Sequence, residues 1–293
     1  MITRRDFAKG TVALGAALAA GALSRQETAV AADAPTKMEL GMVTYQWGAN
    51  WDLDTIFKNL SAAKVMAVEL RTSHKHGVEP TLPADKRAEL KKRFADNPVK
   101  VIGLGSAECF DHLDPAKLEK AIQTTKDFLK LSADLGLSGV KVRPNDLHKE
   151  VAKEKTIEQI GKSLNVVGKF AGELGQQIRL EIHGGCCEIP TIKAIMDVAT
   201  DPNVGLCWNS NDNDLHGEGL EANFKAVRSR LGATTHVRPL DTPRYPWDKL
   251  IELLVKSDYK GWVLLECGNK VDDAVAGLIA QRELYEKFVA KAK

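Results

Sequence analysis

Four polar side chains follow four successive apolar segments in the second half of the chain: Glu181, Asn209, His236 and Glu266. Two carboxylates, an imidazole and an amide oxygen form a mixed oxygen and nitrogen donor set. This set suits one divalent cation such as Mn²⁺, Mg²⁺, Co²⁺ or Zn²⁺. We therefore expect these residues to be metal ligands, provided that the fold brings their segments side by side.

Further polar and aromatic side chains lie at or just beyond the ends of apolar segments, and we interpret them as candidate substrate contacts. They are Tyr45, Trp47, Glu69, Arg71, His74, His76, Lys141, Arg143, His183, Trp208 and Arg238. Each alone has an ordinary structural explanation, such as a counter-charge, a loop contact or a core-edge histidine. Asn209 could equally cap a turn through its side chain. The third predicted strand leads to Glu108 and His112, so such groups recur at every predicted strand end, which favours a functional site.

The apolar segments alternate with longer amphipathic ones. The predicted strands are 38–45, 67–71, 99–105, 139–143, 177–183, 204–208, 234–237 and 261–266, and the predicted helices are 53–64, 83–95, 114–135, 156–174, 189–198, 220–230, 247–257 and 272–290. Most of the strands are near-continuous apolar runs, which is typical of a parallel sheet buried on both faces. Strict alternation of eight strands and eight helices predicts an α/β protein with a single (β/α)₈ TIM barrel domain.

A doubly wound open sheet is the alternative fold. No G-x-G-x-x-G motif follows the first predicted strand, so this alternative is disfavoured. In a TIM barrel, active sites are built at the carboxyl ends of the strands. The barrel therefore predicts that the polar strand ends converge at one mouth.

The first residues have the layout of an export signal. Arg4 and Arg5 precede a weakly apolar run over 10–23, and a small-residue stretch follows at 29–31. Paired arginines, an apolar middle and an A-x-A cleavage site are typical of a twin-arginine (Tat) signal peptide. The apolar run is shorter than the roughly 20 strongly apolar residues of a spanning helix.

We therefore expect three segments: a signal peptide at 1–31, a short N-terminal segment at 32–37 and the barrel domain at 38–293. The mature protein is expected in the periplasm without stable membrane insertion. A cytoplasmic protein with a disordered alanine-rich tail is the alternative.

Composition disfavours nucleic acid as a partner. The full chain has 41 Lys and Arg and 39 Asp and Glu, and removing residues 1–31 removes four basic and two acidic residues, which leaves a net charge of zero. Proteins that grip a phosphate backbone usually carry a basic surplus. Five cysteines form no disulfide scaffold, and assembly into a homo-oligomer is left open.

The strand endings LEIHG, CWNSN, THVRPL and LLECG, with VELRTSHKHGVEP after the second predicted strand, resemble the xylose isomerase-like TIM barrel superfamily of sugar isomerases and epimerases, and its exported members in particular. The resemblance covers about residues 38–290. In the epimerase branch, a Glu, an Asp, a His and a Glu from strands five to eight bind one divalent metal, and the two Glu move protons. Glu181, His236 and Glu266 match, whereas Asn209 stands where Asp is expected and offers a weaker ligand.

The resemblance implies a carbohydrate substrate and proton abstraction next to a carbonyl through an enediolate, with Glu181 and Glu266 as catalytic residues. A lyase or hydratase on keto-sugars or 3-keto-glycosides would share the first step. A non-catalytic sugar-binding barrel is the alternative motivated by Asn209. DNA repair of the endonuclease IV type is disfavoured, because that site needs many histidines and the chain has 7.

Overall fold

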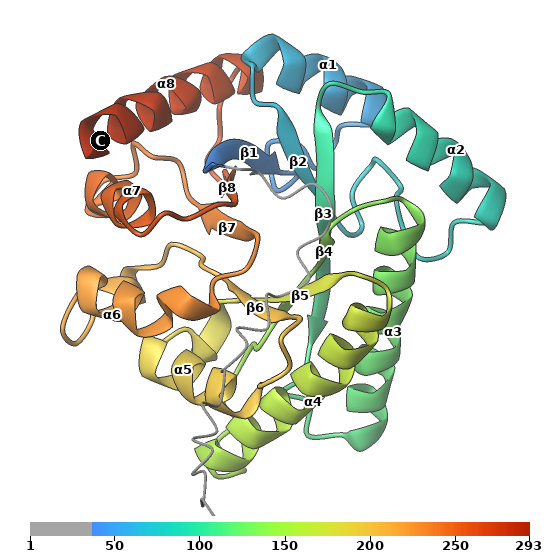
Figure 1. The fold of residues 1–293 in the computed structure, drawn as a ribbon, viewed down its shortest axis with the longest axis vertical. Coiled ribbons are helices and arrows are strands. Elements are labelled where there is room, and N and C mark those ends of the chain that lie inside the picture. Colours follow the sequence, from blue (N-terminus) through green and yellow to red (C-terminus); the bar gives the residue numbers. More distant parts are fainter. Residues whose placement is uncertain (1–36) are drawn as a thin grey trace, which may run out of the picture.

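A computed structural model describes residues 37–293. The expected signal peptide and nearly all of the expected 32–37 segment lie outside the described residues. Within them, strands and helices alternate along the whole chain, as Figure 1 shows.

The parallel strands are β1 (Glu39–Val43), β2 (Ala67–Arg71), β3 (Lys100–Cys109), β4 (Gly139–Arg143), β5 (Gln177–Glu181), β6 (Val204–Cys207), β7 (Thr234–Val237) and β8 (Trp262–Leu265). The helices are α1 (Leu53–Ala63), α2 (Ala84–Ala95), α3 (Pro115–Asp134), α4 (Lys153–Glu173), α5 (Ile189–Val198), α6 (Leu220–Val227), α7 (Trp247–Lys256) and α8 (Ala274–Ala292). They surround the strands (Figure 1). The predicted (β/α)₈ TIM barrel is confirmed.

Paired strands follow the order β6-β5-β4-β3-β2-β1-β8-β7, all parallel. Strands β6 and β7 close the barrel through only a few backbone contacts. The amide of His236 donates to the carbonyl of Trp208 at 2.6 Å, and the amide of Ser210 donates to the carbonyl of His236 at 3.1 Å. The seam of the barrel therefore lies where two of the candidate ligands, Asn209 and His236, form a bridge.

Side-chain caps begin three of the eight α-helices, α1, α3 and α8. The Asp52 side chain accepts from the amide of Thr55 and begins α1, and Asp114 caps α3 through the amide of Ala116. Helix α4 begins at Lys153, earlier than the predicted Thr156, and its N-cap residue Ala152 makes no side-chain cap.

The core lies mainly between strands and helices. A smaller apolar cluster fills the barrel interior and consists of Val43, Ala67, Ile102, Trp262 and Leu264. Gly139, at φ +144°, begins β4 where a Cβ atom would collide with the carbonyl oxygen of Gln177, so no other residue fits there. Among the helices described, none combines the length and hydropathy needed to cross a bilayer.

Candidate active site

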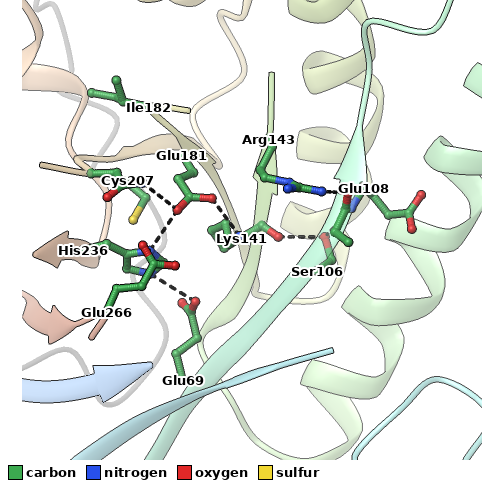
Figure 2. Close-up of polar contacts among 12 residues, drawn as sticks. Glu69, Ser106, Glu108, Lys141, Arg143, Glu181, Ile182, Cys207, His236 and Glu266 are labelled. Carbon is green, nitrogen blue, oxygen red and sulfur yellow. Dashed lines mark hydrogen bonds and ion pairs between the residues drawn. The ribbon is translucent and has the colours of Figure 1, made fainter. Parts of the chain in front are cut away.

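Three of the predicted ligands meet at the carboxyl ends of their strands (Figure 2). His236 Nδ1 lies 3.1 Å from Glu181 Oε1 and 4.0 Å from Glu266 Oε2. One donor atom from each of the three residues lies within 4.8 Å of the other two. Successive side chains of a strand point to opposite faces. Glu181 at the end of β5, His236 on β7 and Glu266 directly after β8 all point into one site at the barrel mouth.

Both oxygens of Glu181 have partners. Its Oε2 accepts from Lys141 Nζ at 2.8 Å, and its Oε1 accepts from Asn209 Nδ2 at 3.0 Å. Lys141 and Glu181 are almost fully buried, so this is an ion pair inside the barrel mouth. The carboxylate of Glu181 is consequently held in one orientation.

Glu69 lies behind the imidazole of His236. His236 Nε2 is 3.2 Å from Glu69 Oε1, and both side chains are fully buried. A Cβ atom at Gly105 would come within 3.0 Å of the same oxygen, so glycine on β3 leaves the room that Glu69 occupies. Glu69 does not line the cleft described below. A carboxylate on one ring nitrogen fixes the orientation of the ring and leaves the other nitrogen for a ligand.

The surroundings of Glu181 and Glu266 shift the pKa values of these two carboxyl groups in opposite directions. Burial favours the neutral form of Glu181, but the Lys141 ammonium and His236 outweigh burial and hold its pKa well below the ordinary value. Burial and the negative charge of Glu181 raise the pKa of Glu266.

The pKa of His236 is raised well above its ordinary value. Burial acts to lower it, whereas Cys207 and the flanking carboxylates Glu69 and Glu181 raise it. Burial also acts to lower the pKa of Lys141, and the carboxylates Glu181, Glu266 and Glu69 raise it above the ordinary value. The centre is therefore a compact network of paired opposite charges.

A cleft of about 460 Å³ opens above the cluster. Its lining is mostly polar and comes from seven of the eight strand ends: Tyr45, Arg71, Lys141, Arg143, Glu181, His183, Asn209, Ser210, Asn211, Arg238, Pro239, Thr242, Glu266, Gly268 and Asn269. Nε of Arg143, Nδ1 of His183 and Nε of Arg238 are buried and have no hydrogen-bond partner among the described residues. The two guanidinium Nε atoms can donate to a polar ligand, and His183 Nδ1 can donate or accept according to its tautomer.

The aromatic residues Trp47 and Trp208 are not brought to the cleft. Trp208 is fully buried and packs edge-on against Phe224, outside the barrel. Trp47 is covered by α8 at Gly277, and its indole donates to the carbonyl of Asn269 at 2.7 Å. Neither indole lines the cleft, and Tyr45 is the aromatic side chain that does.

The two loop histidines are tied to the protein itself. His76 is buried, with Nε2 2.8 Å from the carbonyl oxygen of Arg71 and Nδ1 accepting from the amide of Val78. His74 lies against Thr44 and Arg71, and burial beside the Arg71 guanidinium lowers its pKa to about 4. These contacts shape the loop after β2, and neither ring lines the cleft.

The loops after β6 to β8 add residues that the strand-end pattern missed, including Ser210, Asn211, Thr242 and Asn269. Asn211 begins the turn Asp212–Leu215 as a capping box, a signal that could have been read. Asp212 pairs with Arg238, and Asp214 accepts from the hydroxyl of Tyr245, so neither reaches the ligand cluster. Asn209 therefore remains the fourth polar group beside it.

The donor set fits a divalent cation. Glu181, His236 and Glu266 supply two carboxylates and an imidazole nitrogen, and Asn209 can turn an amide oxygen to the same point after exchange of its hydrogen bond to Glu181. Catalytic zinc sites keep three protein ligands and one open position. Carboxylate and amide oxygens also suit Mn²⁺ and Mg²⁺.

Similar solved structures share this fold. The apo form of 3-keto-D-glucoside 4-epimerase, YcjR, from E. coli has 13% identity and a TM-score of 0.72, over 86% of this chain and 100% of that chain. L-ribulose 3-epimerase has 15% identity and a TM-score of 0.73, over 87% and 95%. IOLI protein, solved with a binding zinc atom, has 17% identity and a TM-score of 0.74, over 87% and 99%.

No curated protein matches the sequence. The family model of the xylose isomerase-like TIM barrel matches residues 57–286. This range contains all four polar residues of the cluster and seven of the eight strands. Because the match spans most of the chain, the protein belongs to the xylose isomerase-like TIM barrel family.

Proposed function

We propose that the protein is a metal-dependent sugar isomerase or epimerase that moves a proton at a carbon next to a carbonyl. The observation that carries this proposal is the convergence of Glu181, His236 and Glu266 at the floor of a polar cleft. A cleft at the strand ends, with buried carboxylates of opposed pKa shifts, is the usual setting for acid–base chemistry.

Glu181, His236 and Glu266, with the amide oxygen of Asn209, would hold one divalent cation. When bound, the cation supplies positive charge that stabilises an enediolate on the sugar oxygens. Glu69 would keep the ring of His236 oriented for this purpose.

The two carboxylates have different tasks in this proposal. Glu181 remains an anion held by Lys141 and serves as a ligand. Glu266 is partly open to the cleft, with 17% of its side chain exposed, and its raised pKa suits a group that takes up and returns a proton. This narrows the sequence-based expectation, which gave both carboxylates a part in proton transfer.

Basic side chains of the cleft would bind the oxygens of the sugar. Lys141, Arg143 and Arg238 line the cleft with the uncharged donors Ser210 and Asn211. Cationic donors aimed at a developing oxyanion lower the barrier of enolisation. Tyr45 offers a ring face for the apolar side of a sugar.

A free sugar or glycoside is the substrate class that we favour. The export signal expected at residues 1–31 would place the protein in the periplasm, where sugar phosphates are scarce. The similar structure YcjR is a 3-keto-D-glucoside 4-epimerase, which adds keto-glycosides to the compounds worth testing.

The test is proton exchange in D₂O. Signal-processed protein is stripped with a chelator, reloaded with Mn²⁺, Co²⁺ or Zn²⁺, and incubated with ketoses and 3-keto-glycosides. We expect one deuterium at the carbon beside the carbonyl, together with an isomer or epimer detected by NMR. Glu266→Gln should abolish the exchange, and Glu218→Gln, on an exposed loop, should retain it.

Two outcomes would contradict the proposal. Sugar binding without exchange by any metal-loaded form would favour the non-catalytic sugar-binding barrel. Exchange that always ends in loss of a glycosidic leaving group would assign the protein as a lyase.

A further inference from the structure

A second group of candidate metal ligands lies at the rim of the barrel. Cys109 ends β3, and Asp111 and His112 follow it in the loop that leads to α3. One donor atom from each of the three lies within 4.8 Å of the other two. The predicted site at the ends of β5 to β8 uses none of these residues.

The spacing of the sulfur and the imidazole fits one tetrahedral cation. Cys109 Sγ lies 3.6 Å from His112 Nε2. With Zn–S near 2.3 Å and Zn–N near 2.0 Å, a tetrahedral angle separates the two donor atoms by about 3.5 Å. Phe110 between them is fully buried and anchors the backbone that carries both ligands.

Asp111 supplies an independent observation. The residue is only 3% exposed, and its Oδ1 is buried without a hydrogen-bond partner among the described residues. Its other oxygen, Oδ2, accepts from the amide of Asp146 at 3.1 Å and lies 3.0 Å from His148 Nε2. A carboxylate fixed through one oxygen, with the other oxygen buried and free, is arranged as an oriented metal ligand is.

The cluster does not have the features of a nucleophilic cysteine. Burial, together with the negative charge of Asp111, raises the pKa of Cys109 to about 12. Reactive cysteines instead have a lowered pKa in electropositive surroundings. A bound cation would displace the thiol proton, as metals do at cysteine ligands.

We propose that Cys109, Asp111 and His112 form a second cation site, of the zinc class, with one position left to solvent or a further ligand. Thiolate, imidazole and carboxylate together select a borderline cation such as Zn²⁺ or Co²⁺ over Mg²⁺.

The role of this site is structural. Asp111 binds the amide of Asp146 in the loop after β4, and Asp146 Oδ1 accepts from the amide of Gly185 in the loop after β5. A cation on Asp111 would thus secure three adjacent loops at the rim, next to Arg143 of the cleft, which is paired with Cys109 across β3 and β4.

Cobalt is the probe for the test, because a thiolate ligand gives Co²⁺ a near-ultraviolet charge-transfer absorption that oxygen and imidazole ligands do not. The metal-free full chain is titrated with Co²⁺ beside Cys109→Ser, His112→Ala and Cys187→Ser. We expect two equivalents and the charge-transfer band in the wild type, and one equivalent without the band in Cys109→Ser. His112→Ala should bind the second equivalent at least about tenfold more weakly, and Cys187→Ser, a matched change of a half-buried thiol, should resemble the wild type.

His236→Ala separates this site from the site of the proposed function. Cys207 borders His236 (Figure 2), so a band from the first site would disappear in that variant, whereas a band from Cys109 would persist. Absence of the band in the wild type, or its persistence in Cys109→Ser, would overturn the proposal and leave the 3.6 Å contact as an S–H···N hydrogen bond.

Discussion

Glu181 at the end of β5 and Glu266 after β8 are both within reach of His236, yet their surroundings differ. Glu181 is 1% exposed and contacts Lys141, Asn209 and His236, whereas Glu266 is 17% exposed and faces the cleft. One side of the cluster is therefore crowded with partners and the other side is open.

The difference teaches that neighbours, more than burial, decide what a buried carboxylate can do. Burial favours the protonated form of both residues. Only Glu181 has an ammonium group within hydrogen-bond distance, and only its pKa is lowered. The same residue type is thereby divided into a fixed anion and a group able to exchange a proton.

The sharpest way to break this comparison is Glu181→Gln. Lys141 would lose its partner inside the protein, and breaking a buried pair costs about 3–5 kcal/mol of unfolding free energy. Urea unfolding should show this loss, and the double variant Glu181→Gln with Lys141→Met should recover much of it. Equal stabilities of the single variant and the wild type would mean that the ion pair does not hold Glu181.

Glu266→Gln should act on catalysis and leave stability nearly unchanged. Loss of a positioned acid–base group lowers kcat by about 10²–10⁴-fold, while a neutral amide also removes the repulsion from Glu181. Steady-state kinetics with the substrate found by deuterium exchange, beside urea unfolding of the same samples, would measure both effects. A variant as active as the wild type would remove Glu266 from the proton transfer.

Asp214 sharpens the comparison as a third buried carboxylate, one with no ammonium or guanidinium group in direct contact. Burial raises its pKa from 3.8 to about 7, although the hydroxyl of Tyr245 and the amide of Asn211 donate to it. The folded protein keeps the proton between about pH 4 and pH 7 while the unfolded chain releases it, so stability falls as pH rises through this window.

We expect the loss to reach about 3 kcal/mol between pH 4 and pH 7. Asp214→Asn should remove this part of the pH dependence. The measurement is the difference in unfolding free energy between wild type and variant across the window, which cancels the other titrating groups. A difference that does not change with pH would show that Asp214 has an ordinary pKa.

The smallest expected effect concerns Asn209, which contacts Glu181 on the crowded side of the cluster. Asn209→Asp adds a carboxylate beside Glu181, which should tighten Mn²⁺ binding by about tenfold and lower the stability of the metal-free protein through repulsion. Calorimetric titration with Mn²⁺ would measure the affinity. Unchanged affinity would mean that residue 209 is not a ligand.

The fold was predictable because the barrel repeats one simple unit. Apolar runs mark the buried strands, and capping residues such as Asp52 and Asp114 mark helix starts. Together they located the elements to within a few residues. The uncapped start of α4 and the extension of β3 to Cys109 were not visible, because a bulged register with β4 sets the latter.

The ligand cluster was predictable from the residues at the strand ends. Among the aromatic residues, the orientation of Trp208 was also predictable. Alternation along β6 places Trp208 outside whenever Cys207 and Asn209 point inside, so its position in the core was readable from the sequence. The pairing of Glu69 with His236 was not readable, because 167 positions separate them and only the closed barrel brings them together.

The seam between β6 and β7 links metal binding at the site to closure of the barrel. Asn209 follows β6 and His236 lies on β7, the two neighbouring strands that share the fewest backbone contacts, and the two residues form one of the bridges that close the ring. A cation bound by both residues would hold these two strands together and stabilise the closed barrel. Metal binding and closure of the barrel between β6 and β7 would then be coupled. On metal addition, hydrogen exchange of the backbone amides of Ser210 and His236 would slow more than exchange of amides elsewhere in the barrel.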